Sequence, residues 1–191
     1  MKPVPNYVTC WRYLLAIIPV YKEDSKNATE VYYLDGKKET YDCRCETIAE
    51  HLARKFHTTT EVIRSQSGLL LTEADSDKRG EKRRVPLVLQ DRFCLVPIKF
   101  REKKKHNDST IGYIVLQYVD RVVDLPDGGS RILFYISAWA PATLQRRKTV
   151  ESQLQRAWTL QKWFGEEIQD WEKDNSSAKD RLTSRHLLKS V

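Results

Sequence analysis

The feature that most constrains the fold is a pair of apolar runs, Val85–Leu89 and Phe93–Phe100, separated by a polar triplet. Their β-branched and aromatic residues, and the short interval between them, predict two strands joined by a turn. Basic residues flank the pair on both sides, and a hairpin would bring these flanks together into one basic edge. The flanking basic residues are Lys82, Arg83, Arg84, Lys99, Arg101, Lys103, Lys104 and Lys105.

The net charge of the chain is concentrated in this segment. Residues 77–105 hold eleven Lys or Arg and four Asp or Glu, a net charge of +7 that equals the formal net charge of the whole chain. The rest of the sequence is therefore neutral. With an isoelectric point near 9.2, this concentration favours a polyanionic partner: DNA, RNA or an acidic membrane surface.

The longest apolar run near the N-terminus, Tyr13–Tyr21, is far shorter than the roughly 20 residues of a membrane-spanning helix. It also lacks the charged start and the small-residue cleavage pattern of a signal peptide. We therefore expect a cytoplasmic protein without a membrane partner. In that compartment thiols stay reduced, so Cys10, Cys43, Cys45 and Cys94 are expected to be free.

The first two-thirds of the chain has mainly strand patterns. A buried strand is expected within Tyr7–Tyr21, and Asp35-Gly36 joins Glu30–Leu34 to Lys37–Tyr41 as a hairpin, because type I′ turns need positive φ twice. Further strands, with the turn Asp127-Gly128-Gly129 between them, are expected at Ile111–Asp120 and Arg131–Ser137.

One short helix interrupts these strands. Apolar residues recur at intervals of three and four between Cys45 and Phe56, and Asp42 is expected to cap this helix. Thr58–Ser67 fits neither pattern clearly, and Gly68–Thr72 is expected to be a short strand.

A helical period begins near Thr143 and continues to Trp171, and its apolar stripe is expected to be Val150, Leu154, Ala157, Trp158, Phe164, Ile168 and Trp171. Aromatic residues at helical spacing usually pack in the core, so Trp158, Trp163 and Trp171 are expected there. The polar side of this helix starts with basic residues, which suit phosphate contacts. The fold class expected is α+β: a strand-rich N-terminal two-thirds with one short helix, then a long C-terminal helix packed on the sheet. We expect residues 1–172 to form a single DNA-binding domain and residues 173–191 a flexible tail.

Motifs for catalysis or metal binding have little support. Cys43-x-Cys45 is one cysteine pair, whereas zinc sites need about four ligands at fixed spacings. Asp120, Asp124 and Asp127 could form a nuclease-like carboxylate cluster, but Asp127 lies in an evident turn. No Gly-rich phosphate loop or nucleophile motif is present. We expect no enzymatic activity, no cofactor and no metal.

Four segments resemble the competence transcription factor ComK family. VPLVLQDRFCLVPIKF is similar to a Pro-led apolar strand followed by a second strand with Pro near its end, and Gly112-Tyr113-Ile114 is similar to the start of the next strand. LQRRKTVESQLQRAWTLQKWF looks like the basic, Ala-Trp-containing helix of that family, and Arg54-Lys55 before a Thr-rich stretch is also similar. The resemblance covers roughly residues 10–170.

The resemblance implies a bacterial transcriptional activator of DNA-uptake genes that binds paired A/T-rich boxes as a homo-oligomer, largely through the minor groove. Narrow A-tract minor grooves attract inserted Arg and Lys, which suits this composition. It also implies a proteolytic adaptor as a partner, recognised through an apolar-aromatic proline motif in the tail; residues 173–191 offer only His186-Leu187-Leu188. The expected DNA-binding residues are Arg83, Arg84, Arg101, Lys103, Lys104, Arg146, Arg147, Lys148 and Arg156.

Two alternatives stay open on the sequence alone. An RNA-binding or other basic nucleic-acid module would carry the same charge, since charge does not distinguish the two polyanions. A metal-dependent nuclease using Asp120, Asp124 and Asp127 is the alternative from another class of protein.

Overall fold

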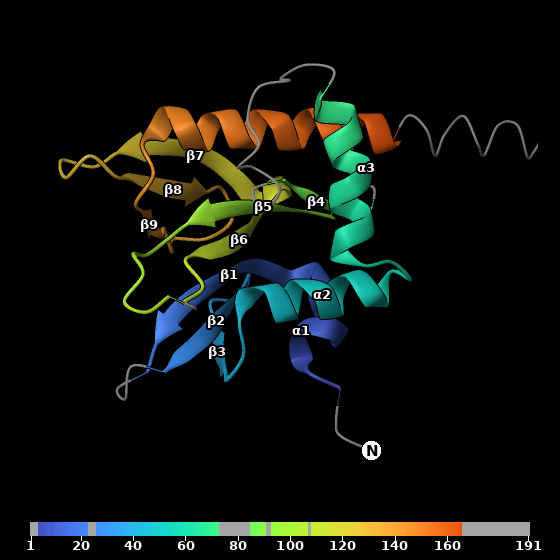
Figure 1. The fold of residues 1–191 in the computed structure, drawn as a ribbon. Coiled ribbons are helices and arrows are strands. Elements are labelled where there is room, and N and C mark those ends of the chain that lie inside the picture. The colour runs from blue at the N-terminus through green and yellow to red at the C-terminus, as the bar shows by residue number, and fades with distance from the viewer. Residues whose placement is uncertain (1–3, 23–25, 73–84, 91–92, 107, 166–191) are drawn as a thin grey trace, which may run out of the picture.

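A six-stranded antiparallel sheet forms the centre of the protein (Figure 1). The structure, a computed structural model, describes residues 4–22, 26–72, 85–90, 93–106 and 108–165. The strand order is β3-β2-β1-β6-β5-β4, so two three-stranded meanders meet where β1 pairs with β6. The strands are β1 (Leu14–Tyr21), β2 (Asn27–Tyr33), β3 (Lys38–Tyr41), β4 (Leu87–Gln90), β5 (Phe93–Lys99) and β6 (Ile111–Val115).

The remaining elements cover the two faces of this sheet. One face carries helices α1 (Asn6–Thr9), α2 (Cys45–Lys55) and α3 (Thr60–Thr72). The other face carries helix 147–165, drawn in orange in Figure 1, and a second antiparallel sheet. The second sheet has the order β7-β8-β9 and consists of β7 (Val119–Asp124), β8 (Ser130–Phe134) and β9 (Ala142–Thr143). Short 3-10 turns lie at Trp11–Tyr13 and Leu116–Tyr118.

The expected α+β class is confirmed, including the long last helix packed on the sheet. Only one short helix was expected before it, whereas α1 and α3 are additional. The segment Ile111–Asp120 is not one strand, because the turn Leu116–Tyr118 divides it between β6 and β7. The described helix ends at residue 165, so the tail proposed for residues 173–191 lies outside the described residues.

The two apolar runs that dominated the sequence are β4 and β5, paired antiparallel as predicted. Their unbroken apolar character follows from burial on both faces, since successive side chains of a strand point to opposite sides. On β5, Phe93 and Leu95 pack with α2 on one face. Cys94 and Val96 pack with helix 147–165 on the other. The hairpin β2–β3 is also confirmed, but its turn is not the type I′ turn expected, because Gly36 takes a positive φ of +81° and Asp35 does not.

A close backbone approach joins the two meanders at Gly112. A Cβ on this residue would lie 2.4 Å from the backbone oxygen of Ile17 and 2.8 Å from Cδ of Pro19. Gly112 therefore makes room for the proline ring in β1. The pairing of β1 with β6 is confined to Ala16 and Ile17, so Pro19, which has no N–H to donate, pairs only with β2.

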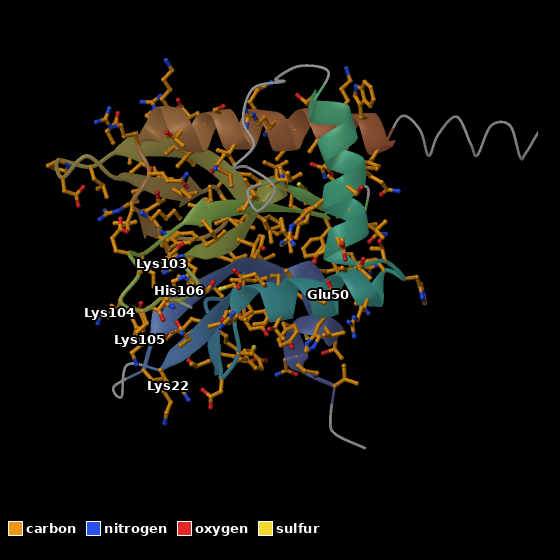
Figure 2. All side chains as sticks on the ribbon, in the orientation of Figure 1. Lys22, Glu50, Lys103, Lys104, Lys105 and His106 are labelled. Carbon is orange, nitrogen blue, oxygen red and sulfur yellow. The ribbon has the colours of Figure 1, made fainter. Side chains whose placement is uncertain are left out.

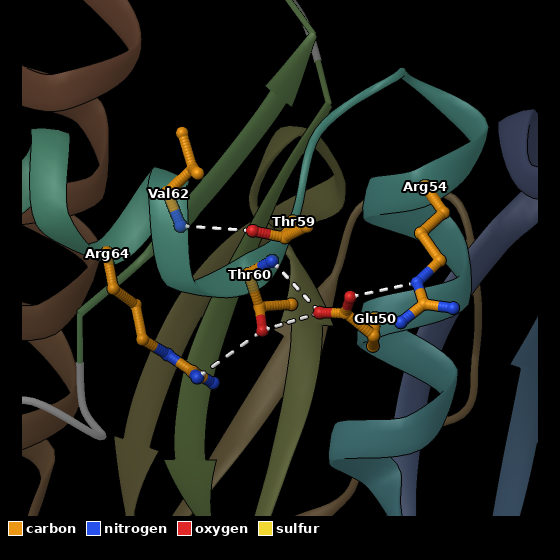
Figure 3. A network of polar contacts seen from close by, with 6 residues as sticks. All are labelled: Glu50, Arg54, Thr59, Thr60, Val62 and Arg64. Atoms are coloured by element: carbon orange, nitrogen blue, oxygen red, sulfur yellow. Dashed lines mark hydrogen bonds and ion pairs between the residues drawn. The ribbon is translucent and has the colours of Figure 1, made fainter.

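The segment expected to be ambiguous and then a strand, Thr58–Thr72, instead contains α3. Figure 3 shows how its start is fixed: Thr59 Oγ1 accepts a hydrogen bond from the Val62 N–H at 3.2 Å, which is an N-cap contact. Glu50 on α2 accepts from the Thr60 N–H at 3.0 Å and from the Thr60 hydroxyl at 2.8 Å. These contacts stabilise the start of α3, whose apolar residues alone do not show a clear helical pattern.

Two further expectations about helices are wrong. Asp42 does not cap α2, whose N-cap is Arg44 without a side-chain hydrogen bond; Asp42 forms an ion pair with Lys22 instead. Trp158 and Trp163 are not in the core, because their side chains are 51% and 43% exposed.

The last described helix buries part of the stripe expected for it: Val150, Leu154 and Ala157 are buried, whereas Trp158 is exposed. Its buried apolar residues follow the spacing of three and four that keeps side chains on one helix face. Trp158, next to Ala157, is turned about 100° away from that face. Trp171 lies outside the described residues. The buried apolar residues of the helix are Val150, Leu154, Ala157 and Leu160.

Candidate nucleic-acid interface

The residues expected to contact DNA fall into three groups, of which the first is Arg83, Arg84 and Arg156. Arg83 and Arg84 lie outside the described residues, and Arg156 is half-buried in the middle of helix 147–165. The second group lies between β5 and β6, and the third at the start of helix 147–165. The second and third groups are Arg101, Lys103, Lys104, Arg146, Arg147 and Lys148.

Two hydrogen bonds link residues next to the second and third groups at one end of the central sheet. The N–H of Lys99, the last residue of β5, donates to Oε1 of Gln145 at 2.8 Å. The N–H of Leu144 donates to the carbonyl oxygen of Lys99 at 3.1 Å. Gln145 directly precedes Arg146, so the chain enters the basic helix start from the point where β5 enters the basic loop. Residues that adjoin two basic segments, more than forty positions apart in the sequence, are therefore hydrogen-bonded to each other.

The loop after β5, which we call the lysine loop (residues 101–106), carries four of the cations of this end. Lys103, Lys104 and Lys105 are exposed, and Figure 2 shows them with Lys22 and His106 on the side of the molecule away from Glu50. Lys103 and Lys105 form no ion pair with another described residue. Lys104 places its ammonium nitrogen 4.6 Å from the ring centroid of Tyr21 on β1.

The carboxylate of Asp108 fixes the backbone of the lysine loop. It accepts hydrogen bonds from the N–H groups of Lys104 and Lys105, at 2.8 and 2.7 Å. It also accepts from the Tyr21 hydroxyl and, at 3.0 Å, from the side-chain amide of Asn27. These bonds, led by that from Tyr21, hold the pKa of Asp108 well below its usual range. The loop is thus anchored to β1 and β2 by one buried, charged residue.

Arg101 belongs to this anchoring network, and the DNA contact expected for it stays a prediction. Its Nε donates to the carbonyl oxygen of Ser109 at 2.7 Å, and its Nη2 donates to Oδ1 of Asn27. The guanidinium lies over the ring of Tyr21 at 3.7 Å from the centroid. The half-buried side chain thereby braces the loop from within.

The start of helix 147–165 presents three exposed basic residues. Arg147 pairs with Glu151 one turn later, with Nε and Oε1 2.7 Å apart. Arg146 and Lys148 form no ion pair with another residue in the described part of the chain. Basic side chains at a helix N-terminus are disfavoured by the helix dipole. An anionic partner at this end would offset that repulsion.

Sequence reasoning missed Tyr21, Asn27 and Asp108. Tyr21 and Asp108 are 87 positions apart, and Asn27 is 81 positions from Asp108, so no local pattern connects them. Lys99 and Lys22 at the same end are exposed in part and pair with Glu102 and Asp42, respectively.

The residues weighed for metal or redox chemistry do not gather. Within the described ranges, no three His, Cys, Asp or Glu side chains lie together as a metal-binding group. Cys45 and Cys94 are buried free thiols, and burial raises the pKa of each. Asp120 pairs with its neighbour Arg121, and Asp127 accepts the Gly129 N–H in the β7–β8 turn, as its sequence context predicts.

Comparisons with protein-family models, with curated proteins and with solved structures find no match for this chain. Of the helices in the described ranges, none has both the length and the apolar composition needed to cross a bilayer.

Proposed function

We propose that this protein binds DNA in a sequence-selective manner and activates transcription, as its resemblance to the competence regulator ComK implies. One observation carries the proposal: Lys99, from which the chain enters the lysine loop, is hydrogen-bonded to Leu144 and Gln145, from which the chain enters helix 147–165. Two basic segments then act as one cationic surface. The proposal keeps the cytoplasmic location expected from the sequence.

The charge balance of this surface supports a polyanionic ligand. Residues 99–106 hold five Lys or Arg and one Glu, and Arg146–Lys148 add three cations. Lys103, Lys105, Arg146 and Lys148 have no carboxylate partner among the described residues, so their charge is available to phosphates. Each phosphate that a cation neutralises releases condensed counterions, which makes binding strongest at low salt.

The proposed mode of DNA reading is insertion of basic side chains into narrow A/T-rich minor grooves. The surface offers Arg and Lys rather than the Asn and Gln side chains that pair with adenine edges in the major groove. A homo-oligomer would span two such boxes, and the same resemblance makes a proteolytic adaptor a proposed partner.

The test measures the affinity of the purified protein for A/T-rich and G/C-rich duplexes at several salt concentrations, by fluorescence anisotropy. We expect tighter binding to the A/T-rich duplex, an affinity that falls steeply with salt, and intact DNA in the presence of Mg²⁺. Replacing A·T by I·C pairs preserves the minor-groove pattern and alters the major-groove one, so binding should survive it. Loss of binding on this exchange would contradict minor-groove reading, and cleavage of the duplex would favour the nuclease alternative.

A second candidate function is binding of single-stranded RNA, and the exposed tryptophans favour it. Trp158 and Trp163 lie on helix 147–165 close in sequence to Arg156 and Lys162, and bases of single strands stack on exposed aromatic rings. Competition between the A/T-rich duplex and a single-stranded RNA of the same length separates the two functions. Tighter RNA binding that is lost in Trp158→Ala would favour the RNA module.

A further inference from the structure

In the lysine loop, the backbone N–H groups of Lys104 and Lys105 are hydrogen-bonded, whereas the side chains of both residues are exposed. Asp108 is 6% exposed, and its four hydrogen-bond donors, among which are the N–H groups of Lys104 and Lys105, are neutral groups. No ion pair joins Asp108 to a described Lys or Arg. The carboxylate thus holds the peptide backbone of the lysines and leaves their ammonium groups exposed to solvent.

We propose that Asp108 is a positioning residue for the nucleic-acid interface: it fixes the lysine loop in the conformation that meets the phosphates. This inference rests on the proposed function and deepens it. A loop that is already ordered loses little conformational entropy on binding, whereas a loose loop must be ordered at that moment. A buried negative charge inside a cationic surface would therefore strengthen the binding of a polyanion.

Contacts of Tyr21 and Asn27 connect Asp108 to further atoms of the lysine loop. Tyr21 donates its hydroxyl proton to Asp108 and accepts the Lys104 N–H at 3.0 Å. Its ring lies beneath the guanidinium of Arg101 and near the ammonium of Lys104. Asn27 links the carboxylate to Arg101 by donating to one and accepting from the other. The loop is therefore held at both its backbone and its first side chain.

Two charge-identical substitutions in this segment should act in opposite directions. Asp108→Asn removes one negative charge and replaces one carboxylate oxygen by an NH2 donor, so the side chain can no longer accept from both Asn27 and the two loop N–H groups. Glu102→Gln also removes one negative charge, from an exposed residue that pairs with the Lys99 ammonium at 2.6 Å. If charge alone mattered, both variants would bind DNA more tightly, because each lowers the repulsion of phosphates.

The experiment compares wild type, Asp108→Asn and Glu102→Gln for binding to the A/T-rich duplex. We expect Glu102→Gln to bind slightly more tightly than wild type. We expect Asp108→Asn to bind roughly tenfold more weakly, because fixing even one residue of the backbone costs about a factor of ten. Amide hydrogen exchange at Lys104 and Lys105 should accelerate in Asp108→Asn alone.

Tyr21→Phe provides a second variant, should Asp108→Asn fail to fold. It removes one hydroxyl from the anchor, keeps the ring and leaves the net charge unchanged, and we expect severalfold weaker binding. Binding by Asp108→Asn or Tyr21→Phe that equals or exceeds that of wild type would overturn the inference while the proposed function stands. A wild-type protein without salt-dependent affinity for DNA would overturn the proposed function and this inference with it.

Discussion

Asp108 and Glu50 are two carboxylates that organise similar polar networks, Asp108 at the lysine loop and Glu50 between α2 and α3 (Figure 3). Figure 2 shows the lysines of that loop and Glu50 on different sides of the molecule. Each accepts a backbone N–H and a hydroxyl group from another segment: Asp108 from Lys104 and Tyr21, Glu50 from Thr60. In both, these hydrogen bonds lower the pKa of the carboxyl group. In both networks the carboxylate fixes the backbone of a nearby segment: Glu50 fixes the start of α3, and Asp108 fixes the path of the lysine loop.

The two networks differ in whether a cation pairs with the carboxylate. Glu50 pairs with Arg54 one turn later on α2, with Nε and Oε1 3.0 Å apart, so the charges there are balanced. Asp108 has only neutral donors, and the lysines that it anchors keep their ammonium groups exposed. We infer that the Glu50 network serves the fold by starting α3, and that the Asp108 network serves the proposed interface.

The largest expected effect comes from a substitution that damages the strand between the two networks. β6 begins just after Ser109, which borders the lysine loop, and contains Tyr113, whose hydroxyl oxygen accepts from Arg64 of the Glu50 network. Gly112→Ala would place a Cβ 2.4 Å from a backbone oxygen. We expect the free energy of unfolding to fall by about 3 kcal/mol, because backbone atoms must shift.

Chemical denaturation measures this loss, and Gly68→Ala is the matched control. Gly68 lies in α3, where an added Cβ meets nothing within 4 Å. Alanine there should raise the free energy of unfolding by roughly 0.5–1 kcal/mol through its higher helix propensity. Equal effects of the two substitutions would contradict the close approach at Gly112.

A charge reversal at the helix start tests which region carries the interface. Arg146→Glu together with Lys148→Glu should weaken DNA binding at least tenfold and flatten its salt dependence by about 0.9 in log–log slope for each lost phosphate contact. Lys55→Glu at the end of α2, another exposed cation, is the control and should change neither quantity much. Unchanged affinity and slope in the double variant would place the helix start outside the interface.

Removing the Glu50 carboxylate should separate stability from binding. We expect Glu50→Gln to lower the free energy of unfolding by about 1 kcal/mol, because Thr60 and Arg54 lose part of their acceptor. DNA affinity of the folded variant should equal that of wild type. Denaturation and anisotropy on the same preparation check both, and a loss of affinity larger than that of Asp108→Asn would reverse the roles assigned to the two networks.

The smallest expected effect is a shared acid sensitivity. The folded pKa values of Asp108 and Glu50 lie below their ordinary values, so unfolding takes up protons in acid. The stabilisation is complete above the unfolded pKa values, near pH 4, and is lost as the pH falls through the folded ones. Denaturation at pH 5 and pH 3 should show a smaller acid loss in Asp108→Asn and Glu50→Gln than in wild type. Identical losses in all three proteins would argue against both depressed pKa values.

Several local features could be predicted because the chemistry that fixes them is close in sequence. The β4–β5 pair follows from two apolar runs around a short polar triplet, and the β2–β3 turn follows from Asp35-Gly36, where Gly36 takes φ +81°. The face of α2 that is buried could be read from its spacing of three and four. The basic character of both flanks of the candidate interface is likewise a property of the sequence.

Tertiary contacts decided which segments form helices, which helix faces are buried and which distant residues are hydrogen-bonded. Thr58–Thr72 contains α3, whose start is fixed by Glu50 of the preceding helix. In helix 147–165, Ala157 is buried while Trp158 of the same expected stripe is exposed. The loop anchor joins Asp108 to Tyr21 across 87 positions, and the meeting of Lys99 with Gln145 spans 46. Sequence patterns report periodicity and charge within a few turns of the chain, whereas hydrogen bonds at such separations exist only after the two meanders have packed. For that reason the sequence alone determined how much positive charge the protein carries. The tertiary structure decided that Arg101 is half-buried in the anchoring network while Lys103, Lys104 and Lys105 are exposed to solvent.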